Sequence, residues 1–67
     1  MRTYLLTSYK PLNTDELRKL GARNIESGSK SSPYSYEFET RQELTRGVVL
    51  EKIPRLKLTE VQITDFS

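Results

Sequence analysis

The sequence predicts one small α+β domain in which strands and helices alternate in the order β-α-β-β-α-β. Three observations support this prediction. Residues 34–39 alternate strictly between aromatic and polar side chains, which is the pattern of a half-buried strand. A helix-capping signature follows a strand-like segment in each half of the chain. The length of 67 residues, 1–67, is enough for a single domain.

Residues 3–9 predict the first strand, because the segment is rich in β-branched and aromatic side chains. The strongest helix signal of the chain comes next. Asn13 and Glu16 have the spacing of a capping box, in which each side chain binds the backbone N–H of the other residue. Gly21 then supplies the left-handed residue that ends many helices. The sequence therefore predicts a helix over residues 14–20.

The middle of the chain predicts two strands joined by a loop. Residues 22–27 favour a second strand, and residues 28–33 are rich in Gly, Ser and Pro, which is typical of a turn. In residues 34–39 three aromatic residues occupy one side of the strand, while Glu37 and Glu39 occupy the other. We expect the aromatic side to face the helices and to form the core.

A second helix is expected between Thr40 and Pro54. Thr40 and Glu43 repeat the capping-box spacing, so this helix should begin near Arg41 and end before Pro54. The alternative is one helical turn followed by a strand over residues 48–52, because the apolar residues here spread around the helix. The interval between cap and proline has an ordinary helical length, which favours the continuous helix.

Residues 59–65 predict the last strand, in which Val61 and Ile63 face the core, while Leu56 and Leu58 pack from the connecting loop. Two β-α-β halves joined by a hairpin resemble the ferredoxin-like plait, a four-stranded antiparallel sheet with both helices on one face. Right-handed crossovers place the first and third strands in the centre and the second and fourth at the edges. The resemblance concerns the fold alone, and a fold does not identify a function.

The composition excludes several chemistries. The chain has no Cys and no His, so it has no thiolate nucleophile, no imidazole base and no Cys- or His-ligated metal. We expect a non-enzymatic protein without cofactor or metal. No segment approaches the ~20 apolar residues of a membrane helix, and the first ten residues lack the apolar centre of a signal peptide. We therefore expect a cytoplasmic protein.

The expected strand orientation indicates a protein-binding surface. With the aromatic residues turned to the helices, Glu37 and Glu39 lie on the open face of the sheet, and the last strand adds Glu60 and Gln62. Three glutamates repel a phosphate backbone, so this face suits another protein or a second copy of the chain. We expect a small subunit, adaptor or inhibitor that acts through this face and an exposed edge strand.

Single-stranded nucleic acid is the alternative partner. Tyr34 and Tyr36 lie on the third strand, where RNA-recognition motifs of the same fold stack bases. Lys52, Arg55 and Lys57 form the densest positive patch of a chain whose net charge is only +2. The basic residue and glycine that begin the third-strand signature of those motifs are missing, and three charges predict weak, salt-sensitive affinity. Protein binding is therefore the preferred hypothesis.

Overall fold

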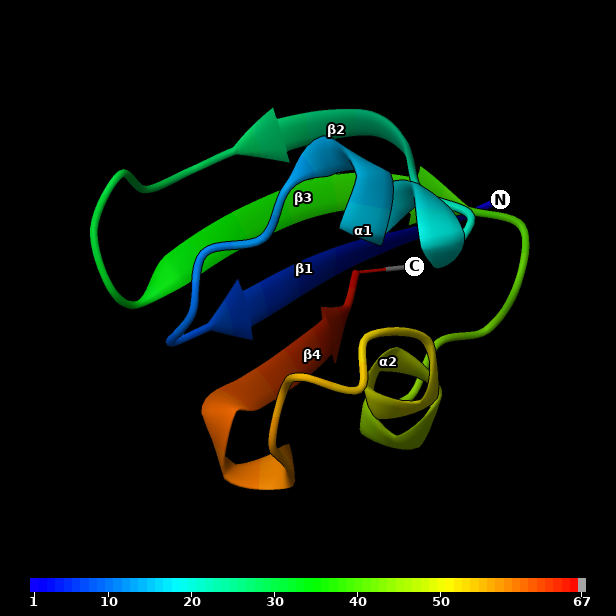
Figure 1. Ribbon diagram of the computed structural model, residues 1–67. Coiled ribbons are helices and arrows are strands. Elements are labelled where there is room, and N and C mark those ends of the chain that lie inside the picture. Colours follow the sequence, from blue (N-terminus) through cyan, green and yellow to red (C-terminus); the bar gives the residue numbers. More distant parts are fainter. Residues whose placement is uncertain (67) are drawn as a thin grey trace.

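The computed structural model describes residues 1–66 and contains four strands, two α-helices and a short 3-10 helix (Figure 1). In chain order these are β1 (Arg2–Ser8), α1 (Thr14–Lys19), β2 (Arg23–Ser27), β3 (Tyr34–Thr40), α2 (Arg46–Lys52), η1 (Leu58–Glu60) and β4 (Val61–Asp65). The strands form one antiparallel sheet in the order β2-β3-β1-β4, so β1 and β3 are central, as predicted. Figure 1 shows both helices on the same side of the sheet. This α+β architecture is compatible with a ferredoxin-like fold.

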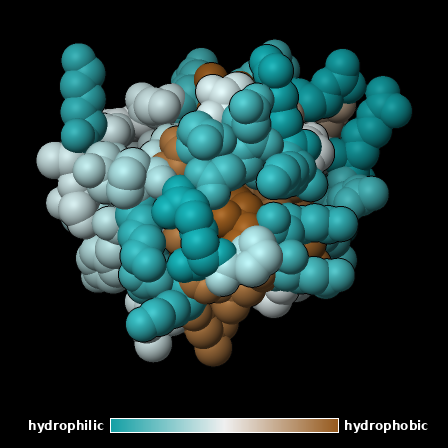
Figure 2. Space-filling model, viewed as in Figure 1, coloured by the Kyte–Doolittle hydropathy of each residue, from teal (hydrophilic) through white to brown (hydrophobic). Residues whose placement is uncertain are grey.

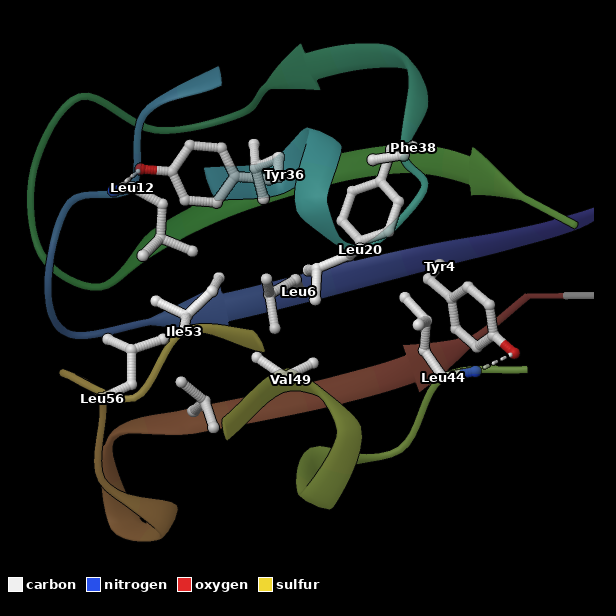
Figure 3. Packing of buried hydrophobic residues seen from close by; sticks show 13 residues of the cluster. Tyr4, Leu6, Leu12, Leu20, Tyr36, Phe38, Leu44, Val49, Ile53 and Leu56 are labelled. Atoms are coloured by element: carbon white, nitrogen blue, oxygen red, sulfur yellow. Dashed lines mark hydrogen bonds between the residues drawn. The ribbon is translucent and has the colours of Figure 1, made fainter. Parts of the chain in front are cut away.

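The hydrophobic core lies between the sheet and the helices (Figure 3). Tyr4 and Leu6 of β1 lie opposite Phe38 and Tyr36 of β3, and all four side chains are buried. The rings of Tyr4 and Phe38 pack in a tilted arrangement with their centroids 6.5 Å apart. The predicted inward orientation of the third-strand aromatics is thus confirmed for Tyr36 and Phe38, while Tyr34 is half-buried against the same core.

Helix α1 forms as its sequence predicts. The side chain of Asn13 accepts the N–H of Glu16 at 2.8 Å, and the carboxylate of Glu16 accepts the N–H of Asn13 at 3.2 Å. Leu17 is the buried residue of the helix. Gly21 has a φ of +81°, a conformation that costs glycine little because it has no Cβ. The local signals therefore predict correctly where α1 begins and ends.

Helix α2 begins at Arg46, and its predicted start near Arg41 is wrong. Thr40, the expected cap, is the last residue of β3 and is fully buried, where its hydroxyl donates to the carbonyl of Gln42. The N-cap is Thr45, whose hydroxyl accepts an N–H of the first helical turn at 3.3 Å. Thr40 is therefore held in the sheet, and its hydroxyl binds the carbonyl of Gln42 instead of capping a helix.

The part of the chain from the end of α2 to the start of β4 tests three further expectations. Residues 48–52 are helical, so the alternative strand there is not formed. Leu56 is buried as predicted, whereas Leu58 is 52% exposed, and its predicted packing is wrong. The physical reason is the 3-10 turn η1, which carries Leu58 away from the core before β4 begins at Val61. Glu60 consequently belongs to η1 instead of the last strand.

Two buried tyrosines connect the two halves of the chain. The hydroxyl of Tyr36 accepts the N–H of Leu12 at 2.9 Å, and the hydroxyl of Tyr4 accepts the N–H of Leu44 at 3.0 Å (Figure 3). Each leucine immediately precedes the N-cap of a helix. The same spacing of 32 residues separates Tyr4 from Tyr36 and Leu12 from Leu44. The two halves therefore use equivalent residues in equivalent places. Each tyrosine hydroxyl binds the backbone just before the helix of the other half.

Candidate protein-binding surface

The side of the sheet opposite the helices is uncovered in the part of the chain that the structure describes. Its residues follow from the register, because side chains alternate between the two faces of a strand. Leu5 lies at the centre of this face, between Glu37 on β3 and Thr64 on β4, and Thr3 lies opposite Glu39. Glu37 is exposed and Glu39 is partly exposed, so both lie on the open face, as predicted.

An irregularity in β2 adds a third glutamate to the open face. Arg23 pairs with Glu39, but Glu26 pairs with Glu37, so the register shifts by one residue between the two pairs. Asn24 lies within this shift and has a φ of +53°, a conformation that is uncommon for residues other than glycine. Its side-chain amide donates to the carboxylate of Glu39 at 2.6 Å. Asn24 thus provides both the unusual backbone and a contact that fixes a neighbouring glutamate.

The shift decides which residues of β2 face the core. Had the first register continued, Ile25 would lie opposite Glu37 on the open face and Glu26 opposite Tyr36 on the core face. In the structure Ile25 packs against the core and Glu26 is exposed. The bulge therefore brings together Glu26, Glu37 and Glu39, which we call the acidic patch.

The acidic patch surrounds a shallow hollow of about 210 Å³, whose lining also includes Asn24 and Thr3. Glu26 and Glu37 are direct cross-strand neighbours, and like charges in such positions destabilise a sheet. Neither carboxylate forms an ion pair with any residue in the range 1–66. No three carboxylates in that range converge as metal ligands. The patch therefore contains two neighbouring carboxylates, those of Glu26 and Glu37, that no ion pair within residues 1–66 compensates.

Glu60 and Gln62, the other residues expected on this surface, lie apart from the acidic patch. The carboxylate of Glu60 accepts the N–H of Lys57 at 2.9 Å and lies 3.5 Å from the ammonium of Lys10. The expected place of Glu60 in the last strand is wrong, because η1 takes that residue into its own turn. Gln62 is exposed on β4 opposite Thr7, and the whole width of β1 separates it from the acidic patch.

One of the three basic residues named for nucleic-acid binding is engaged within the domain. Lys52, Arg55 and Lys57 are all exposed, but Arg55 donates to the carboxylate of Glu16 at 2.7 and 2.8 Å and to the carbonyl of Pro11 at 2.6 Å. The hydrogen bonds from the Arg55 guanidinium hold the pKa of the Glu16 carboxyl below its usual value. The central charge of the predicted basic patch is thus engaged in linking α1 to the segment after α2.

The two tyrosines of the nucleic-acid alternative also face inward. Tyr36 is buried, and its hydroxyl is used by Leu12. Tyr34 is half-buried and packs against the core. Stacking on an exposed base requires an open ring face, which buried Tyr36 does not present.

Comparison of the chain with models of protein families, with curated proteins and with solved structures found no match. Within residues 1–66, neither α-helix has the length and hydropathy needed to cross a membrane. The function is therefore inferred from the geometry of the sheet and its charges.

Proposed function

We propose that this chain is a non-enzymatic protein-binding domain, a subunit, adaptor or inhibitor, whose partner places a basic segment on the acidic patch. The carrying observation is the direct opposition of Glu26 and Glu37 on an uncovered sheet face. Their repulsion costs stability in the free domain. Lys or Arg side chains of a partner would remove that cost on binding and would also select the partner by charge.

The structure favours a partner that docks on the open face of the sheet over one that adds a strand along β2. The bulge and the positive φ of Asn24 distort the edge next to the acidic patch, and bulges are one means by which proteins prevent strand addition. Each exposed ion pair contributes only about 0.2–1 kcal/mol. Binding through the patch is therefore selective and sensitive to salt, and its remaining affinity comes from apolar contacts such as those that half-buried Leu5 can make.

We infer a ferredoxin-like plait, supported by the strand order β2-β3-β1-β4, because that fold covers one sheet face with helices and leaves the other available to a partner. A chain without cysteine suits the reducing cytoplasm, where we propose that it acts.

The test compares three purified, tagged proteins in affinity capture from cells of the source organism. These are the wild type, the patch variant Glu26→Lys/Glu37→Lys and the control variant Glu43→Lys/Glu51→Lys. The control changes two exposed glutamates outside the patch and alters the net charge equally. Proteins and nucleic acids are identified in the same eluate. We expect a protein that the wild type and the control retain and that the patch variant loses.

Direct binding between purified components completes the test. The captured protein should bind the wild-type domain with an affinity that falls as salt rises, and the patch variant should bind at least tenfold more weakly. Equal retention of all proteins by the three baits would contradict the proposal. Retention of nucleic acid alone, abolished by added salt, would instead favour the alternative function.

A further inference from the structure

The two edge strands of the sheet differ in their protection against pairing with another strand. β2 has a bulge, a positive φ and charged residues within a short segment, all of which hinder strand addition. β4 is regular, with every residue from Val61 to Asp65 in register with β1. Its first four residues are uncharged, and it contains no Pro or Lys. β4 therefore lacks the bulge and the positive φ that protect β2, and its charge is confined to Asp65 at its end.

Alternate residues of β4 direct their backbone N–H and C=O groups away from β1. The N–H of Tyr9 donates to the carbonyl of Glu60 at 3.0 Å, and the N–H of Phe66 donates to the carbonyl of Thr3 at 2.9 Å. The residues of β4 that bond to β1 are consequently the even-numbered ones. The odd-numbered residues Val61 and Ile63 direct their backbone groups toward the edge.

The space beside this edge is open. A groove of about 280 Å³ runs along it and is lined by Gln62, Ile63 and Thr64 of β4 and by Arg46 at the start of α2. Leu58 precedes β4 and Phe66 follows it, and both are large apolar side chains that are more than half exposed. In Figure 2, apolar surface reaches the lower rim of the molecule, where Figure 1 shows η1. Apolar side chains thus flank an accessible row of hydrogen-bonding groups.

We propose that β4 pairs antiparallel with β4 of a second copy of this chain, so that one sheet continues through both copies. The twofold axis passes beside Ile63, whose N–H and C=O bond reciprocally to Ile63 of the second copy. This register places Gln62 opposite Thr64 of the second copy, an uncharged pair on the open face. The acidic patches, on β2 and β3, lie at opposite ends of the joined sheet and do not repel each other closely.

A second copy fits this edge because the outward N–H and C=O groups of β4 are self-complementary about a twofold axis, and because Gln62 and Thr64, which face each other across that axis, are uncharged. Arg46 is the charged side chain that lines the edge groove, and it approaches Arg46 of the second copy near the axis. Salt screens that repulsion, so association should strengthen as ionic strength rises. The strand contact is only about 17 Å long, so it buries less surface area than a standard protein–protein interface. We therefore expect a dissociation constant of roughly 10–100 µM.

The first test is sedimentation equilibrium of the full chain from about 1 µM to about 1 mM. The average mass should rise with concentration from 7.8 kDa toward twice that value, and more steeply at high salt. Backbone amide signals of Val61 and Ile63 should shift with concentration in NMR spectra, while those of β2 should not. A mass of 7.8 kDa at every concentration would overturn the proposal.

The second test uses charges to examine the register. The variants Gln62→Lys/Thr64→Lys and Gln62→Glu/Thr64→Glu change exposed side chains, so each should unfold at nearly the wild-type temperature. Each alone should remain monomeric, because like charges then face each other across the axis. An equimolar mixture of the two should form a heterodimer. Dimerisation of the lysine variant alone, or a monomeric mixture, would overturn the proposed pairing.

Two controls separate this proposal from the proposed function. Ser27→Lys changes an exposed residue of β2 and should dimerise like the wild type. Glu26→Lys/Glu37→Lys should also dimerise normally, because the acidic patch lies on the far strands of the sheet. Loss of dimerisation in either control would place the contact between copies elsewhere than β4.

Discussion

The hydroxyl of Tyr36 accepts the backbone N–H of Leu12 at 2.9 Å, so a central strand holds the chain at the point where α1 begins. Tyr4 does the same for Leu44 before α2. Both donors are buried, and a buried N–H without an acceptor is costly. The two tyrosines therefore fix the entry of each helix in addition to filling the core.

Removal of either hydroxyl should destabilise the domain. We expect Tyr36→Phe and Tyr4→Phe each to lower the free energy of unfolding by about 1–3 kcal/mol, because an N–H is left unsatisfied while the ring remains. Urea denaturation followed by circular dichroism measures the change. Tyr9→Phe, which alters an exposed ring, is the matched control and should have no measurable effect. Equal stability of all three variants would show that these bonds contribute nothing net.

The ion pair of Glu16 and Arg55 should make stability depend on acid pH. The pKa of Glu16 is lowered in the folded state, so its contribution is fully present above the unfolded pKa, near 4.5, and is lost as pH falls through the folded pKa. Thermal unfolding measured from neutral pH to pH 2 should show a smaller loss for Glu16→Gln than for the wild type. A Glu16→Gln profile identical to that of the wild type would contradict the assignment.

Position 24 should tolerate glycine and reject most other residues. The φ of +53° at Asn24 is cheap for glycine, so Asn24→Gly should change the unfolding free energy by less than about 0.5 kcal/mol. Asn24→Val should cost roughly 1–2 kcal/mol, because a β-branched residue is strained in this conformation. Chemical denaturation gives both values. A harmless valine would indicate that the bulge can be lost without penalty.

The repulsion within the acidic patch should be visible in the isolated domain. Glu37→Lys replaces a like-charge pair with an opposite-charge pair, so it should raise the unfolding free energy by roughly 0.2–1 kcal/mol at low salt. The gain should shrink as salt is added. Glu43→Lys changes the charge equally outside the patch and should not reproduce the gain. No gain for Glu37→Lys would mean that the two carboxylates do not repel in solution.

Much of the fold is predictable because its signals are local. Alternation identifies β3 and β4, the β-branched and aromatic composition of residues 3–9 identifies β1, and the capping box of Asn13 and Glu16 defines α1. The same capping-box pattern at Thr40 and Glu43 predicts a helix start that is wrong, because Thr40 is buried in the sheet and its preference for a helix cap is not realised. The 32-residue repeat is hard to recognise in the sequence, because the two halves are alike in only a few residues. These include the tyrosine of a central strand and the leucine before each helix cap.

The binding surface is less predictable than the fold. Glu37 and Glu39 follow from simple alternation, but Glu26 reaches the open face only through the shift at Asn24. A one-residue shift exchanges the faces of a strand and has no clear sign in a short polar segment. Glu60 is displaced for a related reason, because a 3-10 turn replaces the first residues of the expected strand.

The exchange of tyrosine bonds between halves has a consequence for chain connectivity. Phe66 donates its N–H to the carbonyl of Thr3, so the two ends of the described chain lie side by side, and the loop over residues 28–33 is the covalent connection between the halves. A circular permutant that links the ends and opens this loop would run from β3 to β2 and would still form both tyrosine bonds. We therefore expect the order of the two halves along the polypeptide to be interchangeable, whereas their mutual contact is not.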